Sequence, residues 1–212
     1  LFTSENILMN KQYITDSYPH DIINHVNPIY FFASSPFIVY GHNSIKDFQT
    51  LIEESKKRYI MFGSSTQGSG SFEAYKLLCE TYKVLEKCQR VGYRSFGSSI
   101  LDIMTGRIDI YATLYANHEH LISLQTINPL TILDINNFSQ LQQVPIITDF
   151  GYRIQVNNWY GLFHKGFSDK EIRSIRESIN TFFDKTKLYN LGYTMHDPSP
   201  VDFWNNQIEL YK

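Results

Sequence analysis

A run of glycine and hydroxyl residues in the first third of the chain has the composition of an anion-binding turn. It extends from Gly63 to Ser71, and its hydroxyls belong to Ser64, Ser65, Thr66, Ser69 and Ser71. Ile60 to Phe62 before it is typical of a strand end, and apolar residues after it recur at helical spacing. Hydroxyls and unpaired N–H groups at a helix start donate hydrogen bonds to anions. The stretch therefore predicts an anion site between a strand and a helix, although many such runs are only turns.

The kind of anion follows from what the run lacks. It has no Lys at the position that a nucleotide P-loop requires, and its glycines do not have the GxGxxG spacing of a dinucleotide turn. A carboxylate therefore fits this stretch better than a nucleoside phosphate.

Metal and catalytic chemistry have weaker support in the sequence. His118 and His120 lie two residues apart, so they point in different directions on a helix, and the other histidines are scattered without ligand spacing. We expect no metal and no cofactor. Ser64 or Ser65 could act as a nucleophile only with a His and an acid nearby, and the run contains no Gly-x-Ser-x-Gly motif. We therefore expect no enzyme, with a hydrolase as the weaker alternative.

The composition is ordinary for a globular protein of one large or two small domains. The 212 residues are 42% hydrophobic and 19% charged, and the net charge is −2. A nucleic-acid-binding protein would carry an excess of basic residues, so we expect no such partner. No apolar run reaches membrane-spanning length, and no signal peptide is recognisable before the strand predicted at Leu1. We do not expect Cys79 on a helix to pair with Cys88 near the next strand, although the sequence leaves that bond open.

Strands and helices alternate along most of the chain, which predicts an α/β fold with a mainly parallel sheet. Residues 29–40 predict one long strand with a break at Pro36 or two strands in tandem, and Ser168 with Glu171 predicts a capping box that starts a helix. Ser199 followed by Pro200 starts the last helix. Further strands are expected at 60–62, 91–93, 108–114, 129–133 and 158–163, and further helices after Ser44, Ser71 and Ser95 and at 118–124.

The order of these motifs resembles the TctC or Bug family, the periplasmic solute-binding proteins of tripartite tricarboxylate transporters. The resemblance covers nearly all of the chain. The matching segments are Leu1–Ser4 with Asn10, Ala33–Phe37, Phe62–Ser69, Val91–Arg94, Asp102–Asp109, Val144–Pro145 and Asn158–Phe163.

The resemblance implies a two-lobed architecture of the type II periplasmic binding proteins, with the ligand held between the lobes. Lobe one would contain residues 1–35 and 134–212, and lobe two residues 36–133. Such a protein would be a periplasmic or extracytoplasmic monomer. It would bind a small carboxylate, such as a di- or tricarboxylate, an aromatic acid or an acidic amino acid, and deliver it to membrane permease subunits.

The resemblance also implies which residues contact the ligand, when the family's contact positions are transferred to this sequence. From the Ser/Gly run these are Ser64, Ser65, Thr66, Gly68 and Ser69, through hydroxyls and backbone N–H groups. Tyr93 would donate its phenol, unless it is a core tyrosine, and Thr113 is a further candidate. Thr3 and Ser4 would contact the ligand from the other lobe, unless they form a plain turn. Trp159 is expected in core or hinge packing and not stacked on a ligand.

The chain also departs from the family pattern. The family's front portion, with central strands of lobe one, has no counterpart, so we expect lobe one to be incomplete, with unpaired strand edges. Gly92 replaces a Pro, and Thr113 lies where many members have an Asp. The alternative hypothesis is therefore a degenerate or truncated member that binds no solute and acts as a protein-interaction module.

Overall fold

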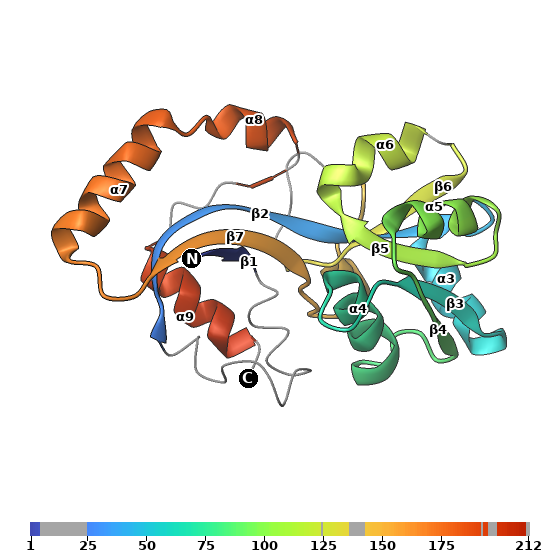
Figure 1. The fold of residues 1–212 in the computed structure, drawn as a ribbon. Helices are drawn as coiled ribbons and strands as arrows, with labels where there is room; N and C mark the ends of the chain where they lie inside the picture. The colour runs from blue at the N-terminus through green and yellow to red at the C-terminus, as the bar shows by residue number, and fades with distance from the viewer. Residues whose placement is uncertain (5–24, 124, 136–142, 192, 195–198, 211–212) are drawn as a thin grey trace. The chain divides into compact units, whose positions relative to one another are not determined.

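The chain forms two compact units in a computed structural model, which describes residues 1–4, 25–123, 125–135, 143–191, 193–194 and 199–210 (Figure 1). Unit 1 comprises Leu1–Ser35 and Asn158–Lys212, and unit 2 comprises Pro36–Asn157. The predicted α/β class is confirmed. No helix of the described ranges is both long enough and apolar enough to cross a bilayer.

Unit 2 contains a mixed sheet. Strand β3 (Ile60–Ser64) is parallel to both β4 (Cys88–Gly92) and β5 (Ile110–Leu114). The long strand β2 (Asn27–His42) enters from unit 1 and is antiparallel to β5 and to β6 (Ile127–Ile132). The expectation of a mainly parallel sheet is thus correct only for β3, β4 and β5. Because β2 precedes the helices of the unit, no crossover helix sets its direction. It also continues through Pro36 without a break.

Helices cover both faces of this sheet, and successive side chains of β2 alternate between the two faces. Val39 packs in a cluster with Phe48 of α3 (Phe48–Lys57). Ile38 packs in another cluster with Ile103 of α5 (Phe96–Met104). The latter cluster also contains Leu121 of α6 (His118–Ser123). Burial on both faces explains why β2 is nearly all apolar, as expected for a central strand.

The helix after the Ser/Gly run is bonded covalently to β4. It starts as α4 (Gly70–Tyr75) and continues as a π-helical segment, η2 (Lys76–Thr81). Cys79 of η2 forms a disulfide with Cys88 of β4, with the Cα atoms 5.9 Å apart. The expectation that the two cysteines stay unpaired was therefore wrong. The prediction placed the two cysteines on separate elements, but η2 and β4 lie side by side at these two residues.

Unit 1 is built on strands and three C-terminal helices. β1 (Phe2–Ser4) is antiparallel to β7 (Asn157–His164), which neighbours β2. The helices are α7 (Asp169–Phe182), α8 (Lys185–Asn190) and α9 (Pro200–Leu210). Phe31, Trp159, Phe163 and Trp204 form the core. Trp159 is fully buried and its indole N–H donates to Oε1 of Gln207 at 2.9 Å, so the prediction that Trp159 lies in the core is confirmed.

The end of unit 2 is held by backbone hydrogen bonds that close a ring. Phe37 N–H donates to Val156 O, Val156 N–H donates to Leu133 O, and Leu133 N–H donates to Phe37 O, at 2.8 to 2.9 Å. The segment 134–157, which the sequence analysis assigned to lobe one, therefore falls within unit 2. The lobe boundaries themselves stay a prediction. β1 ends the strand order and, as far as the described residues go, pairs with β7 alone.

Candidate functional site

The candidate site lies where the parallel strands of unit 2 end. Carboxyl ends of parallel strands share one edge of a sheet, which is where α/β proteins bind ligands. Ser64 ends β3, Tyr93 follows β4, and Thr113 lies near the end of β5. Tyr93 N–H donates to Ser64 O at 2.8 Å, so the ends of β3 and β4 are joined. The fold thus brings the predicted contacts of the Ser/Gly run, Tyr93 and Thr113 to one edge.

The turn between β3 and α4 is tight and needs two glycines. Ser69 N–H and Ser69 Oγ both donate to Thr66 O, at 3.2 and 2.7 Å. Gly68, at the centre of this turn, has φ +80°, which a residue with a side chain rarely adopts. Gly70 begins α4, and an ideal Cβ there would lie 2.2 Å from Cζ of Phe37.

Three hydroxyls of the run hold the turn together. Ser69 Oγ caps α4 by accepting from Phe72 N–H at 3.2 Å. Ser71 Oγ accepts from Ser65 N–H at 2.9 Å. Ser64 is fully buried, and its Oγ accepts from Nε of Arg90 at 2.7 Å. Ser64 and Ser69 therefore have structural partners besides their predicted role as ligand contacts.

Two other hydroxyls are unengaged. Among the hydrogen bonds of the described residues, none uses Ser65 Oγ or Thr66 Oγ1; Thr66 is exposed and Ser65 half-buried. The backbone N–H groups of Thr66, Gly68 and Gly70 likewise have no acceptor in the described part of the chain. The turn thus presents hydroxyl and amide donors together, which is the donor set that a carboxylate accepts.

Arg90 is a site residue that the sequence analysis missed. It lies opposite Phe62 in the register of β3 and β4, and its Nη2 donates to Ser65 O at 2.7 Å. Its guanidinium also lies 4.8 Å from the ring centroid of Phe72. An isolated Arg two residues before a strand end gives no sequence signal, because the contact depends on strand register.

Tyr93 is tied to helix α5. Its hydroxyl donates to Oδ2 of Asp102 at 2.8 Å. Burial and this bond raise the pKa of Tyr93 from 10.0 to about 12, and the same bond holds the pKa of Asp102 below its ordinary value. A carboxylate ligand would have to compete with Asp102 for the phenol proton. The predicted role of Tyr93 as a contact stays a prediction.

The remaining predicted contacts differ in their surroundings. Thr113 is buried, and its hydroxyl accepts from Nδ2 of Asn117 at 3.0 Å, which leaves the hydroxyl proton to donate elsewhere. Thr3 and Ser4 lie in unit 1 as residues of β1, opposite Gly161 and Tyr160, and not in a plain turn. Their role as contacts also stays a prediction.

Among the described residues, this edge of the sheet has neither a metal site nor a Ser–His pair. Within the ranges that the structure describes, no group of three or more His, Cys, Asp or Glu residues could hold a metal ion; His20 falls outside them. Ser64 Oγ accepts from Arg90, and no hydrogen bond of the described residues joins Ser65 Oγ to a histidine. His42 Nδ1 lies 2.8 Å from Ser44 Oγ, but the same nitrogen accepts from Ser44 N–H, as in a local turn.

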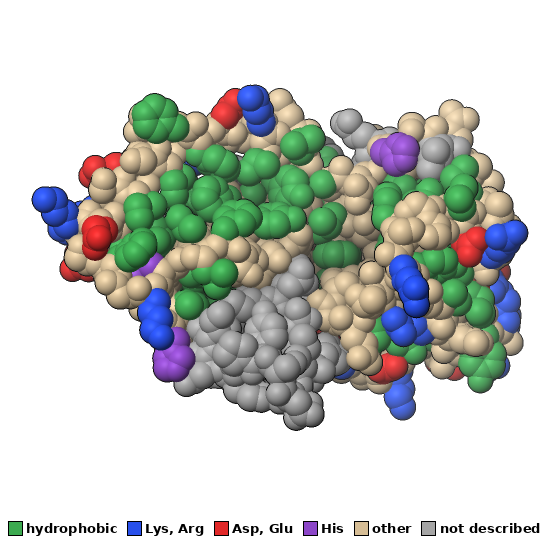
Figure 2. All heavy atoms as spheres, viewed as in Figure 1, with side chains coloured by type: hydrophobic (Ala, Val, Ile, Leu, Met, Phe, Trp, Pro, Cys, Tyr) green, Lys and Arg blue, Asp and Glu red, His purple; other side chains and the backbone are tan. Residues whose placement is uncertain are grey.

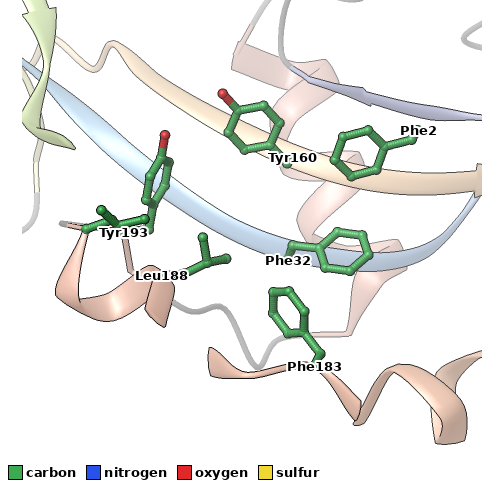
Figure 3. A pocket seen from close by; sticks show the side chains of 7 residues that line it. Phe2, Phe32, Tyr160, Phe183, Leu188 and Tyr193 are labelled. Carbon is green, nitrogen blue, oxygen red and sulfur yellow. The ribbon is translucent and has the colours of Figure 1, made fainter. Parts of the chain in front are cut away.

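Unit 1 contains an apolar pocket with different chemistry. Figure 2 shows hydrophobic side chains gathered on the face between α7–α8 and strands β2 and β7. A cavity of about 440 Å³ opens here (Figure 3). It is lined by Phe2, Phe32, Tyr160, Phe183, Leu188, Leu191 and Tyr193. Phe32 packs edge-on against Phe2, with ring centroids 5.6 Å apart. No lining residue is charged, so the cavity offers a carboxylate no opposite charge.

The architecture matches that of solved periplasmic binding proteins. A TctC solute-binding protein from Polaromonas has a TM-score of 0.78 and 14% identity, over 99% of this chain and 75% of that chain. MatC from Rhodopseudomonas palustris, solved with bound malate, has a TM-score of 0.75 and 15% identity, over 99% and 76%. Rpa4515 from R. palustris, solved with adipate, has a TM-score of 0.77 and 18% identity, over 99% and 74%. The chain has the TctC/Bug fold.

This likeness confirms the predicted two-lobed α/β class of periplasmic binding proteins. At these identities it establishes the fold. About a quarter of each of these chains has no counterpart in the 212 residues. Neither a protein-family model nor a curated relative matches the chain.

Proposed function

We propose that the protein is an extracytoplasmic solute-binding protein of the TctC/Bug type. It captures a small carboxylate and passes it to the membrane permease of a tripartite tricarboxylate-type transporter. Candidate ligands are di- and tricarboxylates, aromatic acids and acidic amino acids. The protein acts as a monomer and catalyses no reaction.

One observation carries the proposal. The turn from Ser64 to Gly70 presents unengaged hydroxyls and N–H groups at the carboxyl end of β3, in a fold whose solved examples include a malate-bound and an adipate-bound protein. Each charge-assisted hydrogen bond to a carboxylate contributes about 1.5–3 kcal/mol. Micromolar binding needs about 8.2 kcal/mol after the cost of association, so several such bonds must act together with further contacts to the rest of the ligand.

The disulfide supports the proposed location. Disulfides persist in oxidising compartments such as the periplasm and are rare in the cytosol. The bond between Cys79 and Cys88 is therefore expected of a protein that works outside the cytoplasm.

Calorimetry tests the proposal with malate, adipate, citrate, aspartate and benzoate as probes. We expect saturable binding of at least one probe by the wild type. The double variant Ser65→Ala/Thr66→Ala should weaken it about tenfold or more without lowering the melting temperature, because those hydroxyls support no described contact. Thr105→Ala, which removes an exposed hydroxyl at the C-cap of α5, is the control. Absence of binding for every probe, or binding that the double variant leaves unchanged, would reject the proposal.

A protein-interaction module is the second candidate function. The observation in its favour is the exposed apolar face of unit 1, where Phe2 is 60% and Leu191 57% exposed. Measured binding of a carboxylate at the Ser/Gly turn would reject this second hypothesis, which assumes that the chain has lost solute binding.

A further inference from the structure

Arg90 connects three parts of the candidate site. It extends from β4, donates through Nε to Ser64 Oγ and through Nη2 to Ser65 O, each at 2.7 Å, and lies over the ring of Phe72 in the first turn of α4. The two hydrogen bonds hold the side chain of Ser64 and the backbone carbonyl of Ser65, the two residues from which the turn starts. A planar guanidinium can hold two acceptors in fixed geometry, which an ammonium group cannot.

The charge of Arg90 is not neutralised by an acid in the described residues. Arg58 forms a two-pronged ion pair with Asp109, and Arg107 pairs with Asp102. In contrast, no ion pair of the described ranges includes Arg90, and both of its hydrogen-bond acceptors are neutral oxygens. Arg90 is also only half-buried, so its positive charge acts on the space around the turn.

Resting on the proposed function, we infer that Arg90 is the positioning residue of the carboxylate site and the source of its preference for charged ligands. Arg90 donates to Ser65 O, whose partial negative charge would otherwise repel an anion bound at the turn. Its guanidinium is bonded to Ser64 Oγ and Ser65 O, so its charge is held next to the residues that carry the unengaged hydroxyls, Ser65 and Thr66. The site therefore discriminates an anion from a neutral molecule of the same shape, beyond what hydroxyl and amide donors achieve.

The test compares adipate with adipamide, its neutral analogue, by calorimetry at low and high salt. The variants are Arg90→Met, which removes the charge, and Arg90→Lys, which keeps the charge but loses the forked geometry. Lys57→Met, which removes an exposed positive charge at the end of α3, is the matched control. Thermal unfolding of each variant is measured alongside.

We expect Arg90→Met to weaken adipate binding about tenfold or more, to weaken adipamide binding much less, and to flatten the salt dependence. Arg90→Lys should weaken both ligands but keep the adipate preference and the salt dependence. A merely structural arginine would instead lower the adipate and adipamide affinities equally in Arg90→Met, and that result overturns the inference. If Arg90→Met does not fold, Arg90→Gln, which also removes the charge but keeps N–H donors, is measured in its place against the same two outcomes.

The two levels of the proposal fail separately. A wild type that binds neither adipate nor malate refutes the proposed function and this inference with it. A wild type that binds adipate, with an Arg90→Met variant of unchanged affinity and preference, refutes only the inference.

Discussion

The start of helix α4 is seated directly on the ring of Phe37, because an ideal Cβ on Gly70 would lie 2.2 Å from Cζ of that ring. Phe37 is a buried residue of β2 and belongs to the core of unit 2. Because Gly70 has no side chain, α4 can start against this ring, and the donors of the Ser/Gly turn lie at that start.

Replacing Gly70 with Ala should destabilise unit 2 and weaken carboxylate binding. Overpacking a core typically costs about 1–3 kcal/mol, and here the methyl group displaces the ring or the helix start. Urea unfolding measures the cost. Gly97 is the control, because it also lies in a first helical turn but an ideal Cβ there would meet no atom within 4 Å. Gly97→Ala should be neutral or stabilising by up to about 1 kcal/mol. Equal effects at the two positions would contradict the packing argument.

Breaking the disulfide should destabilise the protein. The bond joins η2 to β4 across nine positions, and closing a short loop of this kind typically stabilises a fold by about 2–4 kcal/mol. A double Cys79→Ser/Cys88→Ser variant should therefore unfold at lower urea concentration than the oxidised wild type. A reductant should lower the wild-type midpoint and leave the variant unchanged. A wild type that is indifferent to reductant would contradict the bond.

The Tyr93–Asp102 bond should make the stability fall at high pH. The folded-state pKa of Tyr93 is raised from 10.0 to about 12, so between these values the unfolded chain loses the proton first. The contribution is complete below pH 10 and is lost as the pH rises toward 12. Tyr93→Phe should show a smaller loss, because the raised pKa values of the buried Tyr40 and of Tyr75 remain, whereas Tyr59→Phe, which changes an exposed tyrosine, should retain the full loss. Urea midpoints measured across this pH range would show it, and parallel curves for wild type and Tyr93→Phe would disprove it.

The apolar pocket of unit 1 should bind a hydrophobic fluorescent dye. Its lining is aromatic and aliphatic, and Leu191 is 57% exposed, so Leu191→Asp should reduce dye fluorescence severalfold without unfolding the unit. Leu101→Asp changes a similarly exposed leucine, 64% accessible, on α5 of unit 2, and should have little effect. Equal losses in the two variants would place the dye elsewhere.

The elements of the fold that were predicted correctly from the sequence are those that follow from local sequence patterns. Ser168 and Glu171 form the expected capping box, with Ser168 N–H donating to the Glu171 carboxylate at 2.8 Å. The start of α9 at Pro200 and the strand–turn–helix around the Ser/Gly run were also predicted. Each depends on neighbours within a few residues, which the sequence displays directly.

The features that could not be predicted depend on tertiary neighbours. The Cys79–Cys88 bond requires η2 to lie beside β4, and the Arg90 contacts require β4 to pair with β3 in one register. The direction of β2 against β5 depends on where β2 enters the sheet, not on its composition. The commitment of Tyr93 to Asp102 likewise joins a strand end to a helix face nine positions away.

The most direct measurement of the central claim is an amide titration of the ¹⁵N-labelled protein with malate and with adipate. We predict that the amide signals of Thr66, Gly68 and Gly70 shift saturably, with the dissociation constant found by calorimetry, while the signal of Gly97 stays in place. Calorimetric binding without a change in any amide from residue 64 to residue 71 would contradict the account.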